Sequence, residues 1–309
     1  GRGGAGGWRG GAGGRGADRR GRPRGSGGGG TPALDGEALY GVAPVLAALR
    51  AGRREVHRLY LQEGLSGDRA GKGPGRKDAG AVRAAVALAE EKGAEVLSSG
   101  KHELNLLSRD RPHQGLVLDA QPLGFTSLPQ MPPASVRDSG GRPPLWLALD
   151  EVLDPQNFGA ILRSAHFLGA SGVVTCGKNS APMSPVVSKA SAGAMEVMEV
   201  YSCRSFPTFL KEAAEGGWDV FGASVADGAV GSREVEVTQA SLLVVGNEGF
   251  GLRPLVERAC TRLVRVDPFE GAGPAGQGSS AVDSLNVSVA TGILLHELLV
   301  SRERGSHRP

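Results

Sequence analysis

Short runs of consecutive apolar residues alternate with helical stretches from residue 145 to the C-terminal part of the chain. The apolar runs predict strands at 145–149, 173–175, 220–223, 242–245 and 263–266. The segments between them predict helices at 160–168, 206–215 and 255–259. Nearly continuous apolar strands joined by helices are typical of a parallel sheet covered on both faces. Because ligands of such sheets bind beyond the carboxyl ends of the strands, we expect the ligand-binding loops after Leu149, Val245 and Val266.

The first third of the chain has a different pattern, which predicts a small α/β domain over residues 35–120. Residues 37–50 have helical spacing, with four apolar side chains on one face: Leu39, Val42, Leu46 and Leu49. Strands are predicted at 56–61, 94–97 and 116–118, and an alanine-rich helix at 79–92. Five prolines without any periodicity occur in residues 121–143, which we therefore interpret as a linker.

The net charge of +3 does not indicate a basic folded body. Residues 1–30 hold seven arginines and one acidic residue, so the remaining residues together carry a net charge of −3. This glycine- and arginine-rich start has almost nothing apolar to bury, and residues 1–34 are expected to be disordered. Two interpretations of it stay open: an RNA tether, or part of an organelle-targeting leader, although it lacks the serines and the amphipathic pattern of leaders.

Composition argues against several classes of protein. No stretch approaches the ~18 uninterrupted apolar residues of a membrane-spanning helix, so no membrane association is predicted. Cys176, Cys203 and Cys260 are scattered and odd in number, which predicts ordinary thiols rather than a disulfide framework or a zinc knuckle. The histidines stand apart from one another, and no metal site is predicted.

Two of the expected loops contain chemically suggestive polar residues. In the loop after Leu149, Asn157 is suited to cap a helix, and Arg163 follows among apolar neighbours. Arg163 is either a functional side chain or an arginine that extends to solvent. In the segment 242–252 a buried strand runs into glycines around Glu248, which lets the backbone approach a ligand closely. A plain tight turn explains that segment equally well.

A third polar group lies at the entry of the last apolar helix, which runs through residue 299. Its members are Ser284, Asn286 and Ser288. Capping of the helix by Ser284 would explain only the first of them. It would leave the other two polar side chains in an apolar environment, where they need partners.

In this order and spacing, the three segments resemble the three motifs of the SpoU (TrmH) family of RNA ribose 2′-O-methyltransferases over about residues 145–299. Residues 35–120 are similar to the ribosomal-protein-L30e-like substrate-binding domain that precedes the catalytic domain in many members. The resemblance implies a C-terminal domain at 144–302 with a trefoil knot, followed by a tail at 303–309. It also implies a homodimer formed through the knotted domain.

The resemblance also implies site residues. The catalytic residues that it implies are Arg163, Asn157, Glu248, Ser284 and Asn286. The contacts to the cofactor, S-adenosyl-L-methionine, that it implies are Gly246, Val266 and Leu285, with Asn247, Gly249 and Ser288 nearby. The chain departs from the family between motifs two and three, where a glycine-rich insertion lies at 270–280 and Asp267 precedes the proline.

The implied activity is 2′-O-methylation of a ribose in RNA, as in the mitochondrial members that act on large-subunit rRNA, relatives of bacterial enzymes that methylate a guanosine. A guanidinium keeps its proton at pKa values above ~12, which is unfavourable for Arg163 as the general base. Two roles for Arg163 stay open: the base itself, or a group that binds the adjacent RNA phosphate while the phosphate or a water assists. Three alternatives stay open: a tRNA substrate, a catalytically silent ribosome-assembly protein, and a dinucleotide-dependent oxidoreductase. The absence of G-x-G-x-x-G after a first strand argues against the last of these.

Overall fold

The computed structural model describes residues 33–65, 79–138, 140–267 and 284–305. The predicted insertion at 270–280, and all but the last two residues of the predicted disordered segment at 1–34, lie outside these ranges. Within them, no helix is both long enough and apolar enough to cross a membrane.

The smaller sheet has four strands in the described part of the chain, in the order β1-β4-β2-β3. Its strands are β1 (Glu37–Tyr40), β2 (Val56–Gln62), β3 (Glu95–Ser99) and β4 (Leu116–Ala120). Its helices are α1 (Val42–Ala51), α2 (Ala79–Glu91) and α3 (Lys101–Ser108). Apolar side chains of β2, β4, α1 and α2 meet in one core, which confirms the prediction of an α/β module in this region.

The predicted helix at 37–50 is wrong in its first four residues, which form β1. Leu39 and Tyr40 pair with Leu118 and Val117 of β4, so the tertiary pairing overrides the helical spacing. Gly41, with φ of 97°, then turns the chain into α1. The sequence did not predict α3, whose apolar side chains are interrupted by polar residues.

The larger sheet has eight strands within the described ranges, in the order β10-β12-β9-β11-β6-β7-β8-β5. Every neighbouring pair in it is parallel, which confirms the predicted parallel sheet. Its strands are β5 (Thr126–Ser127), β6 (Leu145–Leu149), β7 (Gly172–Cys176), β8 (Val200–Cys203), β9 (Asp219–Ala223), β10 (Val230–Gly231), β11 (Ser241–Val245) and β12 (Arg262–Arg265). Its helical segments are α4 (Pro155–Leu168), α5 (Pro185–Ala190), α6 (Ala194–Val197), α7 (Phe206–Glu215), η1 (Ser232–Glu234), α8 (Pro254–Glu257) and α9 (Val287–Gly305).

The strands β5, β8 and β10 were not predicted. β5 lies inside the segment interpreted as a linker, where Thr126 and Ser127 pair with Tyr201 and Ser202 of β8. Further along the same segment, the indole N–H of Trp218 donates to the carbonyl oxygen of Pro132 at 2.9 Å. The proline-rich segment is therefore attached to the large sheet at two places.

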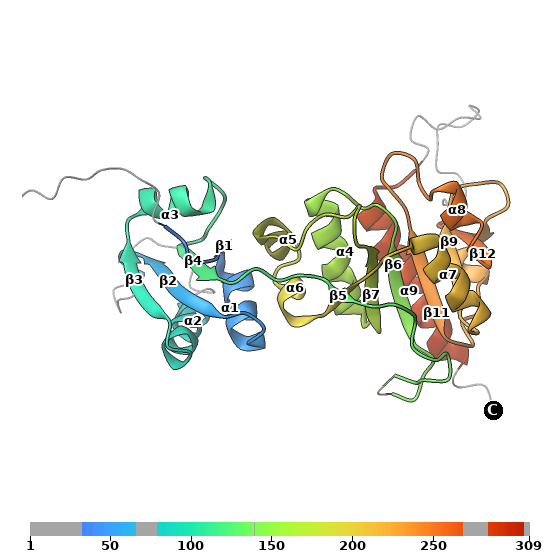
Figure 1. Cartoon of the computed structure of the whole chain (residues 1–309), viewed down its shortest axis with the longest axis horizontal. Helices are drawn as coiled ribbons and strands as arrows, with labels where there is room; N and C mark the ends of the chain where they lie inside the picture. The colour runs from blue at the N-terminus through green and yellow to red at the C-terminus, as the bar shows by residue number, and fades with distance from the viewer. Residues whose placement is uncertain (1–32, 66–78, 139, 268–283, 306–309) are drawn as a thin grey trace, which may run out of the picture. The chain divides into compact units, whose positions relative to one another are not determined.

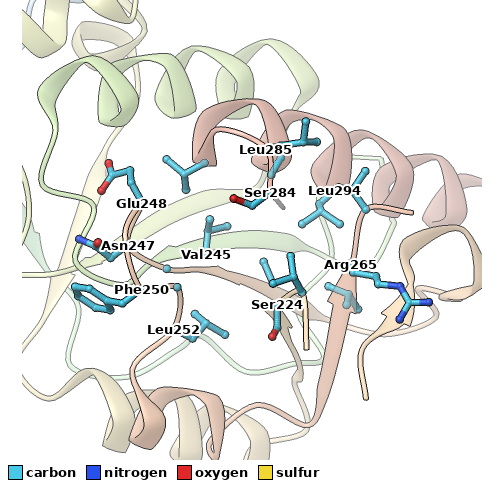
Figure 2. Close-up of a pocket in the computed structure, with 18 of the residues that line it drawn as sticks. Ser224, Val245, Asn247, Glu248, Phe250, Leu252, Arg265, Ser284, Leu285 and Leu294 are labelled. Carbon is cyan, nitrogen blue, oxygen red and sulfur yellow. The ribbon is translucent and has the colours of Figure 1, made fainter. Parts of the chain in front are cut away.

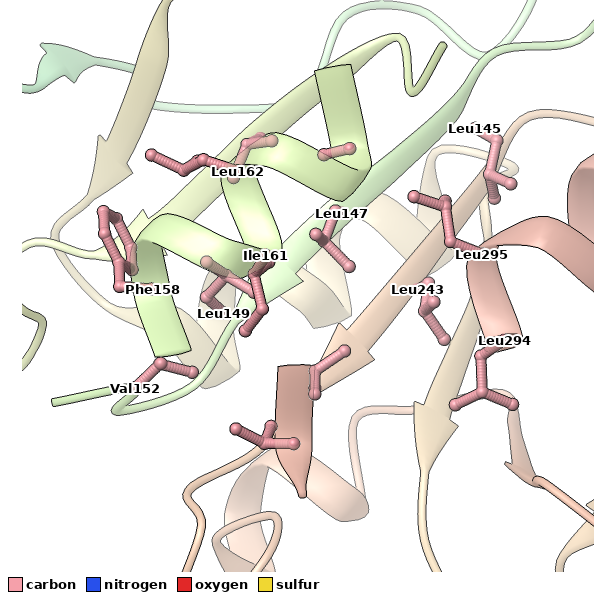
Figure 3. Packing of buried hydrophobic residues seen from close by; sticks show 14 of the residues in the cluster. Leu145, Leu147, Leu149, Val152, Phe158, Ile161, Leu162, Leu243, Leu294 and Leu295 are labelled. Carbon is pink, nitrogen blue, oxygen red and sulfur yellow. The ribbon is translucent and has the colours of Figure 1, made fainter. Parts of the chain in front are cut away.

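Helices cover both faces of the large sheet (Figure 1), and its buried side chains form one cluster on each face. Leu145, Leu147 and Leu149 of β6 belong to a cluster with α4 and α9, part of which Figure 3 draws. The alternate residues Trp146 and Ala148 belong to a second cluster with α7 and α8. Successive side chains of a strand point to opposite faces, so a strand covered on both sides must be apolar at every position. This explains why β6 appears as an uninterrupted apolar run.

Gly159 lets helix α4 pack closely against α5. A Cβ atom at this position would lie 2.5 Å from the Cβ of Ala190 and 2.9 Å from the carbonyl oxygen of Val187. Neither distance is tolerable without movement of the backbone. Glycine therefore permits a contact between the two helices that no other residue would allow, and this contact fixes the position of α4.

A buried ion pair connects residues far apart in the chain. The Arg54 guanidinium donates to both carboxylate oxygens of Glu196, at 2.6 and 3.0 Å, and both side chains are fully buried. Glu37 and the carbonyl oxygen of Gln121 accept its remaining bonds, and Ser188 donates to Glu196. Because every charge here is paired and hydrogen-bonded, truncation of either partner would leave an uncompensated buried charge.

The three cysteines are free thiols. Burial raises the pKa of Cys203 to about 12 and that of Cys260 to about 12, which keeps both sulfurs protonated at neutral pH. Protonated thiols are poor nucleophiles, which agrees with the interpretation of these cysteines as ordinary thiols.

Candidate active site

The loops that follow three neighbouring strands, β9, β11 and β12, open onto one pocket of about 1040 Å³. It is lined by residues 223–225, 245–252 and 264–267 and by the beginning of α9. Figure 2 shows Ser284, Leu285 and Leu294 on one side of this space and Leu252 and Ser224 on the other. Of the three predicted loops, the one after Val245 lines the pocket, and Asp267 is the described residue through which the one after Val266 does so. The loop after Leu149 contributes no lining residue.

Residues 246–252, which we call the glycine loop, close on themselves at a narrow neck. The backbones of Asn247 and Gly251 exchange two hydrogen bonds, of 2.9 and 3.0 Å. A Cβ atom at Gly246 would lie 2.3 Å from the carbonyl carbon of Gly251, so the two backbone segments that form the neck are in direct contact. The tip of the loop, with Glu248 and Phe250, projects beyond the neck and lines the pocket.

A chain of side-chain hydrogen bonds joins the three polar loops. Asn157 donates through Nδ2 to Oε1 of Glu248 at 3.0 Å. Asn286 donates through Nδ2 to Oδ1 of Asn157 at 3.0 Å. Oδ1 of Asn286 accepts from the backbone N–H and the hydroxyl of Ser288. The structure thus brings together four of the residues that the resemblance implied, one or more from each motif.

The helix-start contacts come from residues other than Asn157 and Ser284, the two possible caps that the sequence offered. Asp154, not Asn157, caps α4, since its carboxylate accepts from the N–H of Gln156 at 3.0 Å. Asn286, not Ser284, accepts a first-turn N–H of α9. Since Asp154 does the capping, the amide of Asn157 is available to connect Glu248 with Asn286.

Arg163 lies on the exposed side of α4 and does not line the pocket. Among the described residues it has no hydrogen-bond or ion-pair partner, so all five of its N–H donors are available. Its helix packs against α9, where Gly292 lies close to Ser164. An exposed guanidinium in this position is suited to a phosphate group of RNA.

The remaining implied residues divide between the pocket and its surroundings. Gly246, Asn247, Gly249, Val266 and Leu285 line the pocket, as do Glu248 and Ser284. Asn157, Arg163, Asn286 and Ser288 do not line it. The division separates groups that can contact a bound cofactor from groups that hold or extend the site.

Sequence reasoning missed the loop after β9, where Ser224 and Val225 line the pocket. The rule that ligands bind at the carboxyl ends of parallel strands applies to it as well. The signal was incomplete because the sequence does not reveal that β9 lies between β11 and β12. Phe250 and Leu294, which also line the pocket, were likewise not singled out.

The pocket combines aliphatic walls with backbone polar groups. Val225, Val245, Val264, Val266 and Leu294 supply apolar surface, and the glycine loop supplies main-chain groups at close range. This combination is suited to a nucleoside-sized ligand whose base needs apolar walls and a few directed hydrogen bonds. Among the described residues, no three His, Cys, Asp or Glu side chains are grouped as a metal site would require.

Replacement of Asn286 by alanine should weaken ligand binding or turnover by about 30-fold, because a cap and a side-chain bond are lost together, each contributing ~1 kcal/mol. Asn286 both holds Asn157 and caps α9. Calorimetry of donor binding and single-turnover kinetics measure the two effects separately. Ser288→Ala keeps the backbone bond to Asn286 and loses only the hydroxyl bond, so its effect should be smaller than that of Asn286→Ala. Unchanged binding and turnover in Asn286→Ala would leave this residue a capping role only.

Comparison with known proteins agrees with this geometry. The SpoU rRNA Methylase family model matches residues 144–296, and the model for the RNA 2′-O ribose methyltransferase substrate-binding domain matches residues 38–126. Human "rRNA methyltransferase 1, mitochondrial" is 39% identical over 86% of this chain and 73% of its own length. The "23S rRNA (guanosine-2′-O-)-methyltransferase RlmB" of Pseudomonas syringae is 34% identical over 88% of this chain and 98% of its own.

A solved structure has the same fold. The AdoMet-bound rRNA methyltransferase of Sinorhizobium meliloti aligns with a TM-score of 0.61 and 23% identity over 87% of each chain. The resemblance inferred from the three motifs is confirmed by the family model and by the identity to curated relatives. This chain, with its parallel sheet and its three converging motif loops, belongs to the SpoU rRNA methylase family.

Proposed function

We propose that this chain transfers a methyl group from S-adenosyl-L-methionine to the 2′-hydroxyl of a guanosine in large-subunit rRNA of the mitochondrion. The observation that carries the proposal is the hydrogen-bonded chain Glu248–Asn157–Asn286, which connects all three motifs beside the pocket. The names of the human and Pseudomonas relatives support rRNA, guanosine and the mitochondrion. The AdoMet bound in the solved neighbour supports the methyl donor.

The pocket residues fit such a donor. Backbone groups of Gly246 and Leu285 and the aliphatic side chain of Val266 would hold it, with Asn247 and Gly249 beside them. When bound, the donor supplies a methyl carbon on a positively charged sulfur, which the 2′-oxygen of the ribose attacks in line. The main task of the protein is therefore alignment, which can supply ~7–11 kcal/mol.

Arg163 and Glu248 would perform different parts of this task. Arg163 would bind the RNA phosphate next to the target ribose, since its guanidinium stays charged and presents a planar set of donors. The hydroxyl proton would pass to that phosphate or to a water molecule. Glu248, held by Asn157 and lining the pocket, would orient the reacting groups together with Ser284 and Asn286.

The test is transfer of labelled methyl from S-adenosyl-L-methionine to unmodified mitochondrial large-subunit rRNA, followed by mapping of 2′-O-methyl sites. One labelled guanosine ribose is the expected result. If the protein binds the donor and methylates tRNA but not rRNA, then tRNA is its substrate in place of rRNA. Absence of both donor binding and transfer would indicate a silent assembly protein, and binding of a nicotinamide cofactor would indicate an oxidoreductase.

We also propose that two copies of the chain associate through α4 and α9. These helices pack against each other and expose Phe167, at 86% of its surface, and Val289, at 49%. Large apolar side chains exposed on neighbouring elements are typical of an interaction surface. A second copy would contribute the same surface, as two-fold symmetry requires.

Phe167→Asp should convert the dimer to a monomer in light scattering coupled to size-exclusion chromatography. A charge introduced at a buried interface lacks a partner and opposes association. Leu255→Asp is the control, because Leu255 is also exposed but lies on α8. A monomeric wild-type protein, or a dimeric Phe167→Asp variant, would contradict this interface.

Two further features follow from family membership and are part of the proposal. One is the division into a substrate-binding domain at 35–120 and a catalytic domain at 144–302, which the ranges of the two family models support. The other is a trefoil knot in the catalytic domain. The path from β12 to α9 includes residues 268–283, outside the described ranges, so an experimental chain trace through them is the test of the knot.

A further inference from the structure

The glycine loop is attached at both ends to the two residues that follow β6. At its start, the N–H of Asp150 donates to the carbonyl oxygen of Val245 at 2.8 Å. At its end, Arg253 donates to the Asp150 carboxylate through its backbone N–H, at 3.2 Å to Oδ2, and through its guanidinium Nε, at 2.8 Å to Oδ1. One carboxylate therefore holds the residue where the loop leaves the pocket.

Glu151 adds two further attachments. Its carbonyl oxygen accepts from Nδ2 of Asn247 at 2.9 Å, at the neck of the loop. Its carboxylate accepts from Nη1 of Arg253 at 3.0 Å. Glu151 has a φ of 58°, a backbone conformation that is unfavourable for a residue other than glycine. The surrounding bonds therefore hold a strained residue at the point where the glycine loop is attached.

Asp150 is placed to act from behind the pocket. Its side chain is fully buried, and neither Asp150 nor Arg253 lines the pocket. All seven residues of the glycine loop line it, including Glu248, and so does Val245 at the first attachment. A buried carboxylate that accepts several bonds from one arginine fork sets both the distance and the orientation of its partner. The register of the parallel sheet places Leu149, the last residue of β6, opposite Val245, the last residue of β11. Asp150 and the glycine loop therefore begin at adjacent strand ends.

We propose that Asp150 and Arg253 are positioning residues of the methyl-donor site: their ion pair holds the glycine loop in the shape that binds the donor and presents Glu248. This inference rests on the proposed function, since it concerns the same pocket. Neither residue needs to touch the donor, the RNA or the reacting atoms. Their effect is transmitted through the backbone of residues 246–252.

The experiment compares Asp150→Asn, Arg253→Gln and the double variant with the wild-type protein. Each variant should raise the dissociation constant of S-adenosyl-L-methionine at least tenfold in calorimetry. The dissociation constant of the double variant should be no larger than that of the more impaired single variant, because the two residues act through one ion pair. Arg253→Lys, which keeps the charge but loses the fork, should recover only part of the affinity. Arg233→Gln, which removes an exposed ion pair to Glu297, is the control and should bind normally.

Amide hydrogen exchange separates a local effect from general destabilisation and does not depend on donor binding. The expected result is faster exchange at the N–H groups of Asn247 and Gly251 in the variants, with unchanged exchange in β6. Unchanged exchange at the neck together with normal donor affinity would overturn the proposal. Equally faster exchange throughout the sheet would also overturn it, because the pair would then be a general stabiliser. Wild-type protein that binds no donor would contradict the proposed function, while the exchange data would still test the attachment.

Discussion

Replacing Arg163 with alanine should leave methyl-donor affinity within about threefold of the wild-type value and lower methyl transfer at least ~100-fold, as loss of a charge-stabilising donor does in other enzymes. Arg163 is exposed on α4 and does not line the pocket, so its removal has no direct route to donor binding. It lies on the same helix as Asn157, and its guanidinium has no partner among the residues that the structure describes. Single-turnover transfer to rRNA measures the loss, and calorimetry measures donor affinity.

Two variants on the same helix complete the Arg163 experiment. Arg163→Lys keeps the positive charge but loses the planar fork, so turnover between that of alanine and wild type is expected. His166→Ala removes another exposed side chain of α4 and should leave turnover unchanged. Near-normal turnover by Arg163→Ala would exclude this residue from the mechanism.

The second large effect is expected at Gly246, where alanine should weaken donor binding at least tenfold. The added Cβ would lie 2.3 Å from both the carbonyl carbon and the carbonyl oxygen of Gly251. Because these are backbone atoms, the neck of the glycine loop must open, and overpacking of this kind costs about 1–3 kcal/mol. Calorimetry with S-adenosyl-L-methionine measures the loss of affinity, and thermal unfolding measures the loss of stability.

Gly249 provides the matched control within the same loop. A Cβ there would meet only the side-chain oxygen of Asn247, at an ordinary contact distance of 3.4 Å. Because Gly249 itself lines the pocket, the comparison is made on stability, and Gly249→Ala should leave the melting temperature unchanged. Equal effects of the two substitutions would mean that the neck does not determine the shape of the pocket.

The parts of the fold that the sequence predicted well are those where burial determines the pattern. β6 and α7 were predicted with the residue bounds that the structure has, because β6 is apolar and buried at every position and α7 buries apolar side chains at helical spacing. β8 was missed because Tyr201 and Ser202 interrupt its apolar residues. The first residues of the predicted helix at 37–50 became β1, since pairing with β4 outweighs helical spacing over four residues.

The contacts of the candidate site could not be predicted from the sequence, because they join residues that are far apart along the chain. Sequence order gives the three motifs, but it does not give the strand order that places the loop of β9 in the pocket. Periodicity also does not distinguish Asp154 from Asn157 as the cap of α4, because both residues are good caps. The contact from Asn157 to Glu248 joins residues 91 positions apart, and it becomes visible only when the strands are in place.

The close packing of α4 on α5 at Gly159 bears on how natural variation in this gene should be read. Every amino acid other than glycine carries a Cβ atom, which at this position would collide with Ala190 and with the Val187 carbonyl oxygen. A glycine codon tolerates any base in its third position, so neutral drift at this site should be confined to silent changes. A glycine-to-alanine or glycine-to-serine variant, which substitution scores treat as mild, would displace the helix that carries both Asn157 and Arg163. Variants at this codon should therefore be classed with those at the motif residues.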